Sequence, residues 1–358
     1  MTFKKGDGTA WDGVVRTQET GGLELTRAYW RDVVGPILDR HCSEAPRAVA
    51  RVGTGSDVLT LDDLMSRDHD WGLRLQVFVE VTDVDRVVAV LQEHLPQRFA
   101  GHPTHFAFTG QETPCMGIDV FTVTGFALDR LGFDPRQSPS PADWLSVSGQ
   151  AALEVTGGAV FEDHTGALTE LRRAAGWYPD DLWRYVIACD WQRLDQELPL
   201  MGRAGHRGDE IGSRVIAARL VNITIHLAFA LARWWAPYSK WRGTLFAGLP
   251  HAARVHDNLR AALTADHWAA RSEALNKALH HLAKSQRLAG LPSVDRPCVP
   301  FWDRPYLQID PDLVPAIVDT ISDDTIRNLP IGLGAIDQRT DNVDLLVDAA
   351  RRRAAVGA

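Results

Sequence analysis

Two aspartates, Asp68 and Asp70, stand two residues apart before an apolar run, residues 73–81, that is expected to form a strand. Side chains alternate along a strand, so both carboxylates are expected on one face. Paired carboxylates repel each other unless a cation lies between them. Their oxygens suit Mg²⁺, which proteins bind through one or two carboxylates together with substrate phosphates. The alternative is a solvated acidic turn at the start of the strand.

A third acid lies in a later apolar run. Asp119 stands within residues 118–123, and an acid buried there without a partner would be costly. If this strand pairs with the first, Asp119 is expected on the same face as Asp68 and Asp70. Three carboxylates could then hold two metal ions, or hold one and supply a general base. The alternative is an outward-facing acid on an edge strand.

A glycine-rich turn precedes these acids. Residues 53–56 read Gly-Thr-Gly-Ser and follow a short strand expected over residues 48–52. Glycines let a backbone approach phosphate closely, and free N–H groups with a Ser hydroxyl can cradle it. A helix is expected after the turn, and its N-terminus would favour anions. Gly55 and Ser56 are therefore candidate phosphate ligands, with helix capping as the alternative for Ser56.

Two groups of polar residues stand out in the second half of the chain, which reads as almost wholly helical. Arg214 clusters with Arg203 and Arg207 around a glycine-rich loop, where these side chains could grip phosphate or merely solvate the loop. A second group falls at helical spacing and forms one stripe, which either meets solvent or lines a cleft. Its members are Arg219, Asn222, His226 and Arg233.

The order of elements predicts an α+β protein, with a small mixed-sheet domain followed by a mainly α-helical domain. We expect a loose N-terminus over residues 1–22, the mixed-sheet domain over residues 23–170 and the helical domain over residues 171–358. Ser140, followed by Pro141 and Asp143, has the signature of a helix start. The further expected elements are helices at 23–42 and 84–95 and strands at 105–109, 116–123 and 158–163.

The composition disfavours several classes of function. The chain of 358 residues has a formal net charge of −8, and an acidic surface disfavours binding to extended DNA or RNA. Its four cysteines include no Cys-x-x-Cys pair, which argues against a disulfide framework or a zinc site. Residues 1–11 carry no apolar signal segment, and the most apolar run, residues 215–236, is interrupted by charged and polar residues. We expect a cytoplasmic protein without a membrane span.

Taken together, these residues resemble a known pattern. A Gly-Ser pair, an Asp-x-Asp pair twelve residues later and a third Asp on a later strand are typical of the polymerase-β-like nucleotidyltransferase superfamily, which includes the aminoglycoside nucleotidyltransferases. The string from Gly55 to Gly72 resembles DUF4037, a bacterial family whose name records no activity. One departure is Thr60, where the family pattern has Gly, and this affects turn geometry more than the acids. Further segments that resemble the family are Phe161-Glu162-Asp163, Arg207-Gly208-Asp209, Ala236-Pro237-Tyr238-Ser239-Lys240-Trp241 and Gly334-Ala335-Ile336-Asp337-Gln338.

The resemblance implies roles for the residues already singled out. Asp68 and Asp70 would bind Mg²⁺ on a nucleoside triphosphate, and Asp119 would complete the metal site or activate an acceptor hydroxyl. Gly55 and Ser56 would hold phosphate oxygens. Catalysis would consist mostly of positioning and charge neutralisation.

The resemblance also implies a reaction and its participants. The expected reaction moves AMP from ATP to a hydroxyl of a small molecule, by in-line attack on the α-phosphorus with release of pyrophosphate. Related enzymes often neutralise the triphosphate with a lysine of the helical part, which makes Lys240 a candidate, with a surface lysine as the alternative. The alternative functions are adenylylation of a protein, as in antitoxin-like nucleotidyltransferases, and non-catalytic nucleotide binding or protein interaction on the same fold.

The variants Asp68→Asn and Asp70→Asn test the metal assignment. Each change keeps the shape of the side chain but removes a charge that holds Mg²⁺, so we expect nucleotidyl transfer to be abolished while the fold is kept. The measurement is pyrophosphate release, with circular dichroism as the control for folding. Undiminished turnover in both folded variants would contradict the assignment.

Overall fold

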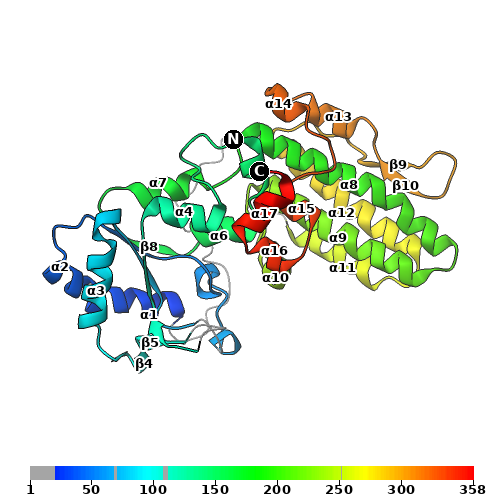
Figure 1. The fold of residues 1–358 in the computed structure, drawn as a ribbon. Helices are drawn as coiled ribbons and strands as arrows, with labels where there is room; N and C mark the ends of the chain where they lie inside the picture. The colour runs from blue at the N-terminus through cyan, green and yellow to red at the C-terminus, as the bar shows by residue number, and fades with distance from the viewer. Residues whose placement is uncertain (1–20, 68–70, 108–111, 251) are drawn as a thin grey trace. The chain divides into compact units, whose positions relative to one another are not determined.

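The structure is a computed structural model and describes residues 21–67, 71–107, 112–250 and 252–358. These residues fall into two compact units (Figure 1). The first, called the α/β unit below, comprises the chain up to residue 139 together with residues 151–176, and the second, the helical unit, comprises residues 140–150 and 177–358. The α+β class predicted from the sequence is confirmed, with a small mixed sheet early in the chain and a helical region after it.

A four-stranded sheet forms the centre of the α/β unit, in the order β7-β2-β1-β8. The strands are β1 Ala48–Arg51, β2 Leu75–Phe78, β7 Ile118–Phe121 and β8 Ala159–Asp163. β1 is antiparallel to both β2 and β8, whereas β2 and β7 are parallel. Every residue of β1 and β2 is buried, which explains why these strands read as continuous apolar runs without alternation.

One face of the sheet packs against four helical segments. α1 Gly22–Tyr29, the π-helical turn Trp30–Val34 and α2 Gly35–His41 follow one another without a break, where the sequence predicted a single helix. Their apolar side chains pack with those of α3 Val84–His94 and with Val77 of β2.

The other face of the sheet packs against α4 Val123–Leu131. Phe78 follows Val77 in β2, so its side chain points to the opposite face. The Phe78 ring lies edge-on to Phe126 of α4, with ring centroids 5.3 Å apart. Thr122 caps α4 by accepting a hydrogen bond from the N–H of Gly125. The remaining elements of this region are α6 Gly149–Thr156, α7 Ala167–Ala174, β3 Arg98–Phe99, β4 His102–Pro103, β5 His105–Phe106 and β6 Cys115–Met116.

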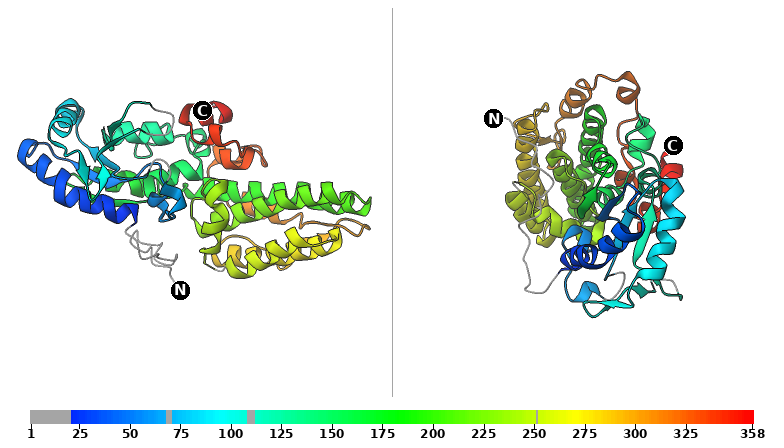
Figure 2. Two further views of the ribbon diagram at one scale, coloured as in Figure 1. Left: turned by 90° about the horizontal axis from the view of Figure 1, so that it is seen from below. Right: turned by 90° about the vertical axis from the view of Figure 1, so that its left-hand side faces the viewer.

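The helical unit is built around two long antiparallel helices. These are α8 Asp180–His206 and α9 Glu210–Ala232, which lie side by side along their length (Figure 2). α10 Ser239–Ala247, α11 Ala252–Thr264 and α12 Trp268–Leu288 follow in the chain, and α11 and α12 pack against α9. The smaller elements are β9 Cys298–Pro300, β10 Leu307–Ile309, α13 Leu313–Val318, α14 Asp324–Arg327, α15 Ile336–Arg339, α16 Val343–Leu346 and α17 Ala349–Val356.

The helix start predicted at Ser140 is confirmed as α5 Pro141–Leu145. Ser140 accepts a hydrogen bond from the N–H of Asp143, whose carboxylate accepts one from the N–H of Ser140. Arg353 of α17 forms an ion pair with the same carboxylate. These contacts explain why residues 140–150 cluster with the helical unit, although the sequence analysis placed them in the first domain.

One described helix, α9, is long and apolar enough to cross a membrane. In its most apolar window 56% is buried inside the helical unit, which is the environment of a core helix.

Gly205 of α8 allows α12 to approach closely. An added Cβ would overlap the Trp268 side chain, whose Cγ would lie 2.6 Å away. We therefore expect Gly205→Ala to destabilise the helical unit by about 1–3 kcal/mol. Gly243 of α10 is the matched control, because an added Cβ meets none of the described atoms within 4 Å, and Gly243→Ala should be neutral or stabilising by up to ~1 kcal/mol. Urea unfolding measures both, and equal effects would contradict the packing argument.

Candidate active site

The predicted glycine turn directly follows the central strand β1. Gly53 and Gly55 have φ angles of +82° and +134°, a region that side chains disfavour. The N–H groups of Thr54, Gly55 and Ser56 have no hydrogen-bond acceptor among the described residues. Three successive free N–H groups can bind an anion such as a phosphate.

The helix expected after this turn is only a single 3₁₀ turn, Asp57–Leu59. A segment of three residues sums too few peptide dipoles to attract an anion, so that part of the expectation is wrong. Ser56 precedes the 3₁₀ turn but makes no capping hydrogen bond with its side chain. Thr60 ends the turn with φ +55°, in the left-handed region that glycine favours. The substitution of Thr60 for the glycine of the family pattern therefore affects the geometry of the turn, as expected.

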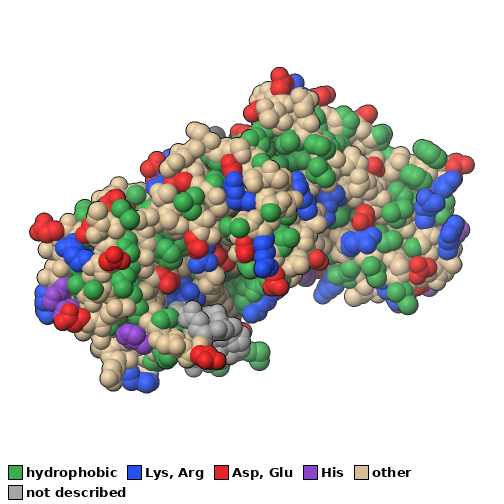
Figure 3. Space-filling view, viewed as in Figure 1, with side chains coloured by type: hydrophobic (Ala, Val, Ile, Leu, Met, Phe, Trp, Pro, Cys, Tyr) green, Lys and Arg blue, Asp and Glu red, His purple; other side chains and the backbone are tan. Residues whose placement is uncertain are grey.

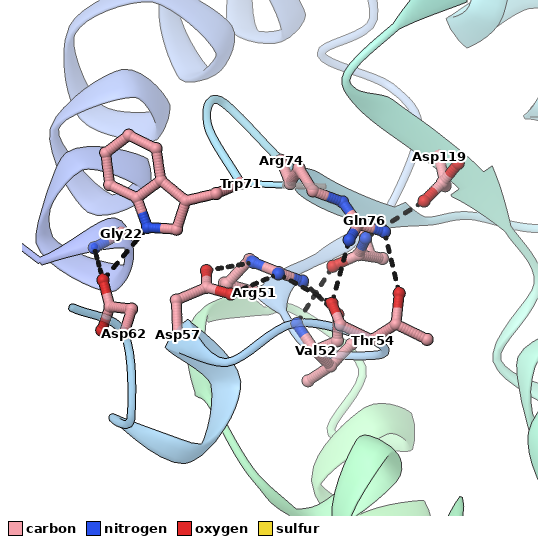
Figure 4. A network of polar contacts seen from close by, with 10 residues as sticks. All are labelled: Gly22, Arg51, Val52, Thr54, Asp57, Asp62, Trp71, Arg74, Gln76 and Asp119. Atoms are coloured by element: carbon pink, nitrogen blue, oxygen red, sulfur yellow. Dashed lines mark hydrogen bonds and ion pairs between the residues drawn. The ribbon is translucent and has the colours of Figure 1, made fainter. Parts of the chain in front are cut away.

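A buried ion pair holds the turn in place (Figure 4). Arg51 donates from Nε to Oδ2 of Asp57 at 2.7 Å and from Nη2 to Oδ1 at 2.6 Å, and the two side chains are 0% and 3% exposed. The same guanidinium also donates to the carbonyl oxygens of Val52 and Thr54. A Cβ on Gly55 would overlap Arg51 Nη2 and Asp57 Oδ1. Gly55 is therefore required by the ion pair as well as by its φ angle.

Asp119 lies close to the turn because Gln76 connects them. Gln76 is 2% exposed and stands opposite Asp119 in the parallel pair of β2 and β7. Its Oε1 accepts from the N–H of Val52 at 3.0 Å, and its Nε2 donates to Oδ2 of Asp119 at 3.1 Å. β7 is an edge strand of the sheet, but the Asp119 carboxylate bonds to Gln76 on the neighbouring strand β2. The other carboxylate oxygen, Oδ1, has no bonded partner among the described residues.

Asp68 and Asp70 lie outside the described residues, so their position beside Asp119 stays a prediction. No group of three acidic, histidine or cysteine side chains suited to a metal occurs in the described part of the chain. A carboxylate with one free oxygen beside free backbone N–H groups fits one ligand of a Mg²⁺–phosphate site. A metal at this place therefore requires Asp68 or Asp70 in addition to Asp119.

The segment on either side of these two acids is anchored. Asp62 accepts hydrogen bonds from the N–H of Gly22, at 2.7 Å, and from Nε1 of Trp71, at 3.1 Å. Asp62 therefore ties the chain on both sides of Asp68 and Asp70 to the start of α1. This contact joins residues far apart in sequence.

Sequence reasoning missed three polar residues of this site, namely Arg51, Arg74 and Gln76. Arg74 is 6% exposed and donates to the carbonyl oxygen of Thr54 at 3.0 Å and to its hydroxyl at 3.2 Å. Their positions in the sequence could have identified them, because each of the three interrupts an apolar run that forms a buried strand or leads into one. A polar residue in such a run needs a partner.

Lys240 and Arg214 belong to the helical unit and have separate surroundings there. Lys240 is exposed at the start of α10, with Nζ 4.6 Å from the centre of the Trp241 ring. Arg214 is half-exposed in α9 and lies 3.9 Å from Asp266. Among the described residues no contact joins these two cations. On the face seen in Figure 3, acidic and basic side chains are interspersed.

A cavity of about 150 Å³ lies at the opposite end of the sheet from the glycine turn. Arg47 and Arg136 line it, but each is paired with acid: Arg47 with Asp39 and Glu162, and Arg136 with Asp134. The hydrogen bonds from Arg136 lower the pKa of Asp134. This cavity therefore offers no uncompensated cation for a triphosphate.

Comparison with known proteins connects the chain to one family. Residues 144–242 match the family model described as "Domain of unknown function (DUF4037)". The resemblance predicted from the sequence is confirmed over these residues, and the matched DUF4037 range does not include the glycine turn or Asp119.

Other comparisons add little about function. A similar solved structure is a nucleotidyltransferase-like protein from Exiguobacterium sibiricum 255-15, with 13% identity, coverage of 75% of this chain and 77% of that chain, and a TM-score of 0.33. This likeness is too distant to bear on function. No curated protein matches the sequence.

The variant Asp57→Asn tests the importance of the buried ion pair. It leaves Arg51 buried without its carboxylate, so we expect the α/β unit to lose about 3–5 kcal/mol of unfolding free energy. The control is Asp83→Asn, which removes the acid of a more exposed pair with Arg86 and should cost less than about 1 kcal/mol. Urea unfolding followed by tryptophan fluorescence measures both. Similar losses in the two variants would contradict the assignment.

Proposed function

We propose that the α/β unit is the catalytic part of a Mg²⁺-dependent nucleotidyltransferase that moves AMP from ATP to a hydroxyl of a small molecule. The observation that carries this proposal is the position of Asp119. Gln76 holds it near a glycine turn with three N–H groups that have no acceptor among the described residues. Free N–H groups can bind phosphate oxygens, and a carboxylate can bind the cation that accompanies them.

The rigidity of the turn supports this function. Transfer of a phosphoryl-type group is catalysed mostly by positioning and by stabilisation of charge, with little covalent chemistry for the protein. Arg51 and Arg74 both donate to the Thr54 carbonyl oxygen, so the turn is held from two sides before any nucleotide arrives. A preorganised group of donors needs no rearrangement when charge develops.

The proposed metal would be held by Asp68, Asp70 and Asp119 and would neutralise the triphosphate. The Ser56 hydroxyl could contact a phosphate, since it makes no capping hydrogen bond in the described structure. Gln76 acts by orienting Asp119, leaving one carboxylate oxygen for the ligand. The ion pair of Arg51 and Asp57 acts by holding the turn.

Calorimetric titration with ATP, GTP, CTP and UTP, each with and without Mg²⁺, tests the proposed function. We expect the wild type to bind ATP only with Mg²⁺, and Asp119→Asn to weaken that binding about tenfold or more, because a charged ligand is lost. Asparagine can still accept the hydrogen bond from Gln76, so the fold should be kept.

The matched control for this titration is Asp129→Asn. Asp129 is an exposed acid of α4 that pairs with Arg130 on the helix surface. The control should bind nucleotide as the wild type does. Absence of Mg²⁺-dependent binding in the folded wild type would overturn the proposal, and binding of another nucleotide would reassign the donor.

A further inference from the structure

Thr54 lies between the two glycines of the glycine turn and is held by two arginines. Its carbonyl oxygen accepts from Nη2 of Arg51 at 2.8 Å and from Nη1 of Arg74 at 3.0 Å. Nη2 of Arg74 also donates to the Thr54 hydroxyl at 3.2 Å, so that both guanidinium groups lie beside this residue (Figure 4). One backbone oxygen therefore has two charged donors, although a single donor would satisfy it.

The two donors determine where the next N–H group points. The peptide bond between Thr54 and Gly55 is planar and trans, so its N–H points opposite to its C=O. Because both arginines hold the carbonyl oxygen of Thr54, the N–H of Gly55 points away from them. This N–H has no acceptor among the described residues, and residues 54–56 keep some exposed surface. The N–H of Gly55 is therefore oriented and available to a ligand.

The same contacts make the N–H of Gly55 a stronger donor. Hydrogen bonds that share a peptide group polarise one another. Two guanidinium groups at the oxygen draw electron density away from the nitrogen, which leaves its hydrogen more positive. A charged acceptor forms the stronger hydrogen bond with such a donor. The arrangement therefore favours an anion such as a phosphate over a neutral ligand at this N–H.

The two arginines differ in what else they hold. Arg51 forms the buried bidentate pair with Asp57 and donates to the carbonyl oxygen of Val52, so its loss would break the structure of the turn. Arg74 leads into β2 and meets Thr54 at its carbonyl oxygen and its hydroxyl. If Arg74 is replaced, the carbonyl oxygen keeps its bond from Arg51 and stays satisfied. The contribution of Arg74 can therefore be tested while the fold is kept.

Arg74 makes a two-point contact with Thr54. The planar guanidinium presents its N–H donors at a fixed separation, and here two of its nitrogens meet two oxygens of one residue. One hydrogen bond fixes a distance, whereas two also limit the rotation of Thr54. A lysine ammonium would keep the charge, but it is a point charge without this fixed geometry.

Direct contact between Arg74 and a phosphate is the main alternative. A lysine would then serve nearly as well, because it binds phosphate as a point charge. The Thr54 hydroxyl separates the two roles, because the two-point contact requires it and the charge of Arg74 does not depend on it. A phosphate contact made by the hydroxyl itself would be independent of Arg74.

We propose that Arg74 is a positioning residue for phosphate binding, which orients the N–H of Gly55 toward the polyphosphate of the substrate through its two-point contact with Thr54. This inference rests on the proposed function and deepens it, because it assigns the side chains on which polyphosphate binding depends. The base and the sugar of the nucleotide take no part in this contact. Inorganic tripolyphosphate with Mg²⁺ is therefore a suitable probe.

Calorimetric titration of the full chain with Mg²⁺ and inorganic tripolyphosphate tests the two-point contact. We expect Thr54→Val, which keeps the branched shape but removes the hydroxyl, to weaken binding about tenfold, and Arg74→Lys to do the same. The double variant should bind no more weakly than either single variant, because both changes break one contact. Thr54→Ser keeps the hydroxyl and should bind as the wild type does.

The matched control is Thr264→Val at the end of α11. The Thr264 hydroxyl is exposed and donates to the carbonyl oxygen of Arg260, so this variant should bind as the wild type does. The thermal unfolding midpoint of each variant checks that the fold is kept.

The outcomes separate this inference from the proposed function. A wild type that binds neither Mg·tripolyphosphate nor any of the four nucleotides overturns the proposed function. Three results would each overturn the role of Arg74 alone: a wild type that binds nucleotide but no tripolyphosphate, wild-type affinity in Thr54→Val, or losses that add in the double variant.

Discussion

The α/β unit depends on a buried ion pair at the end of its central strand. Taking Arg51 and Asp57 out of water is costly, and only excellent geometry repays the cost. The geometry here is bidentate, and the remaining guanidinium donors reach two carbonyl oxygens of the following turn. This contact also contributes to the need for glycine at residue 55, because an added Cβ would overlap both side chains.

Polar side chains within buried strands connect that turn to the rest of the sheet. Gln76 satisfies both ends of its amide across three strands, from the residue after β1 to Asp119 on β7. A buried amide destabilises the fold unless both its oxygen and its nitrogen are hydrogen-bonded. The groups that surround Gln76 must therefore include polar partners. Two adjacent strands therefore bring Asp119 toward the turn that follows β1.

The helical unit shows how burial alone separates two similar contacts. Arg219–Glu197 and His226–Asp190 join the same two helices at equivalent positions. Water screens the first pair, so it contributes little to stability or reactivity. The second is shielded, and a buried carboxylate with all its donors in place controls which ring nitrogen of His226 carries a proton. The matched DUF4037 range contains both of these residues.

The sequence by itself determined the elements and the fold class, because apolar periodicity and local capping are short-range properties. The strands at residues 48–52 and 73–81, the helix start at Ser140 and the long helices after residue 179 were all predictable in this way. The glycine turn and Asp119 were also visible as candidates, since their residue types are unusual where they occur. Arg51, Arg74 and Gln76 were not predicted as site residues, because their roles depend on hydrogen-bond partners elsewhere in the fold.

Only the tertiary structure decided which polar residues meet. Strand order and register place Gln76 opposite Asp119, and helix register places His226 beside Asp190. Among the described residues, Lys240 contacts Trp241 and Arg214 lies near Asp266. The physical reason is that a buried polar group must find its partner wherever the fold brings one. That partner can lie 36 residues away, as for His226, or 148 residues away, as between Gln338 and Asp190.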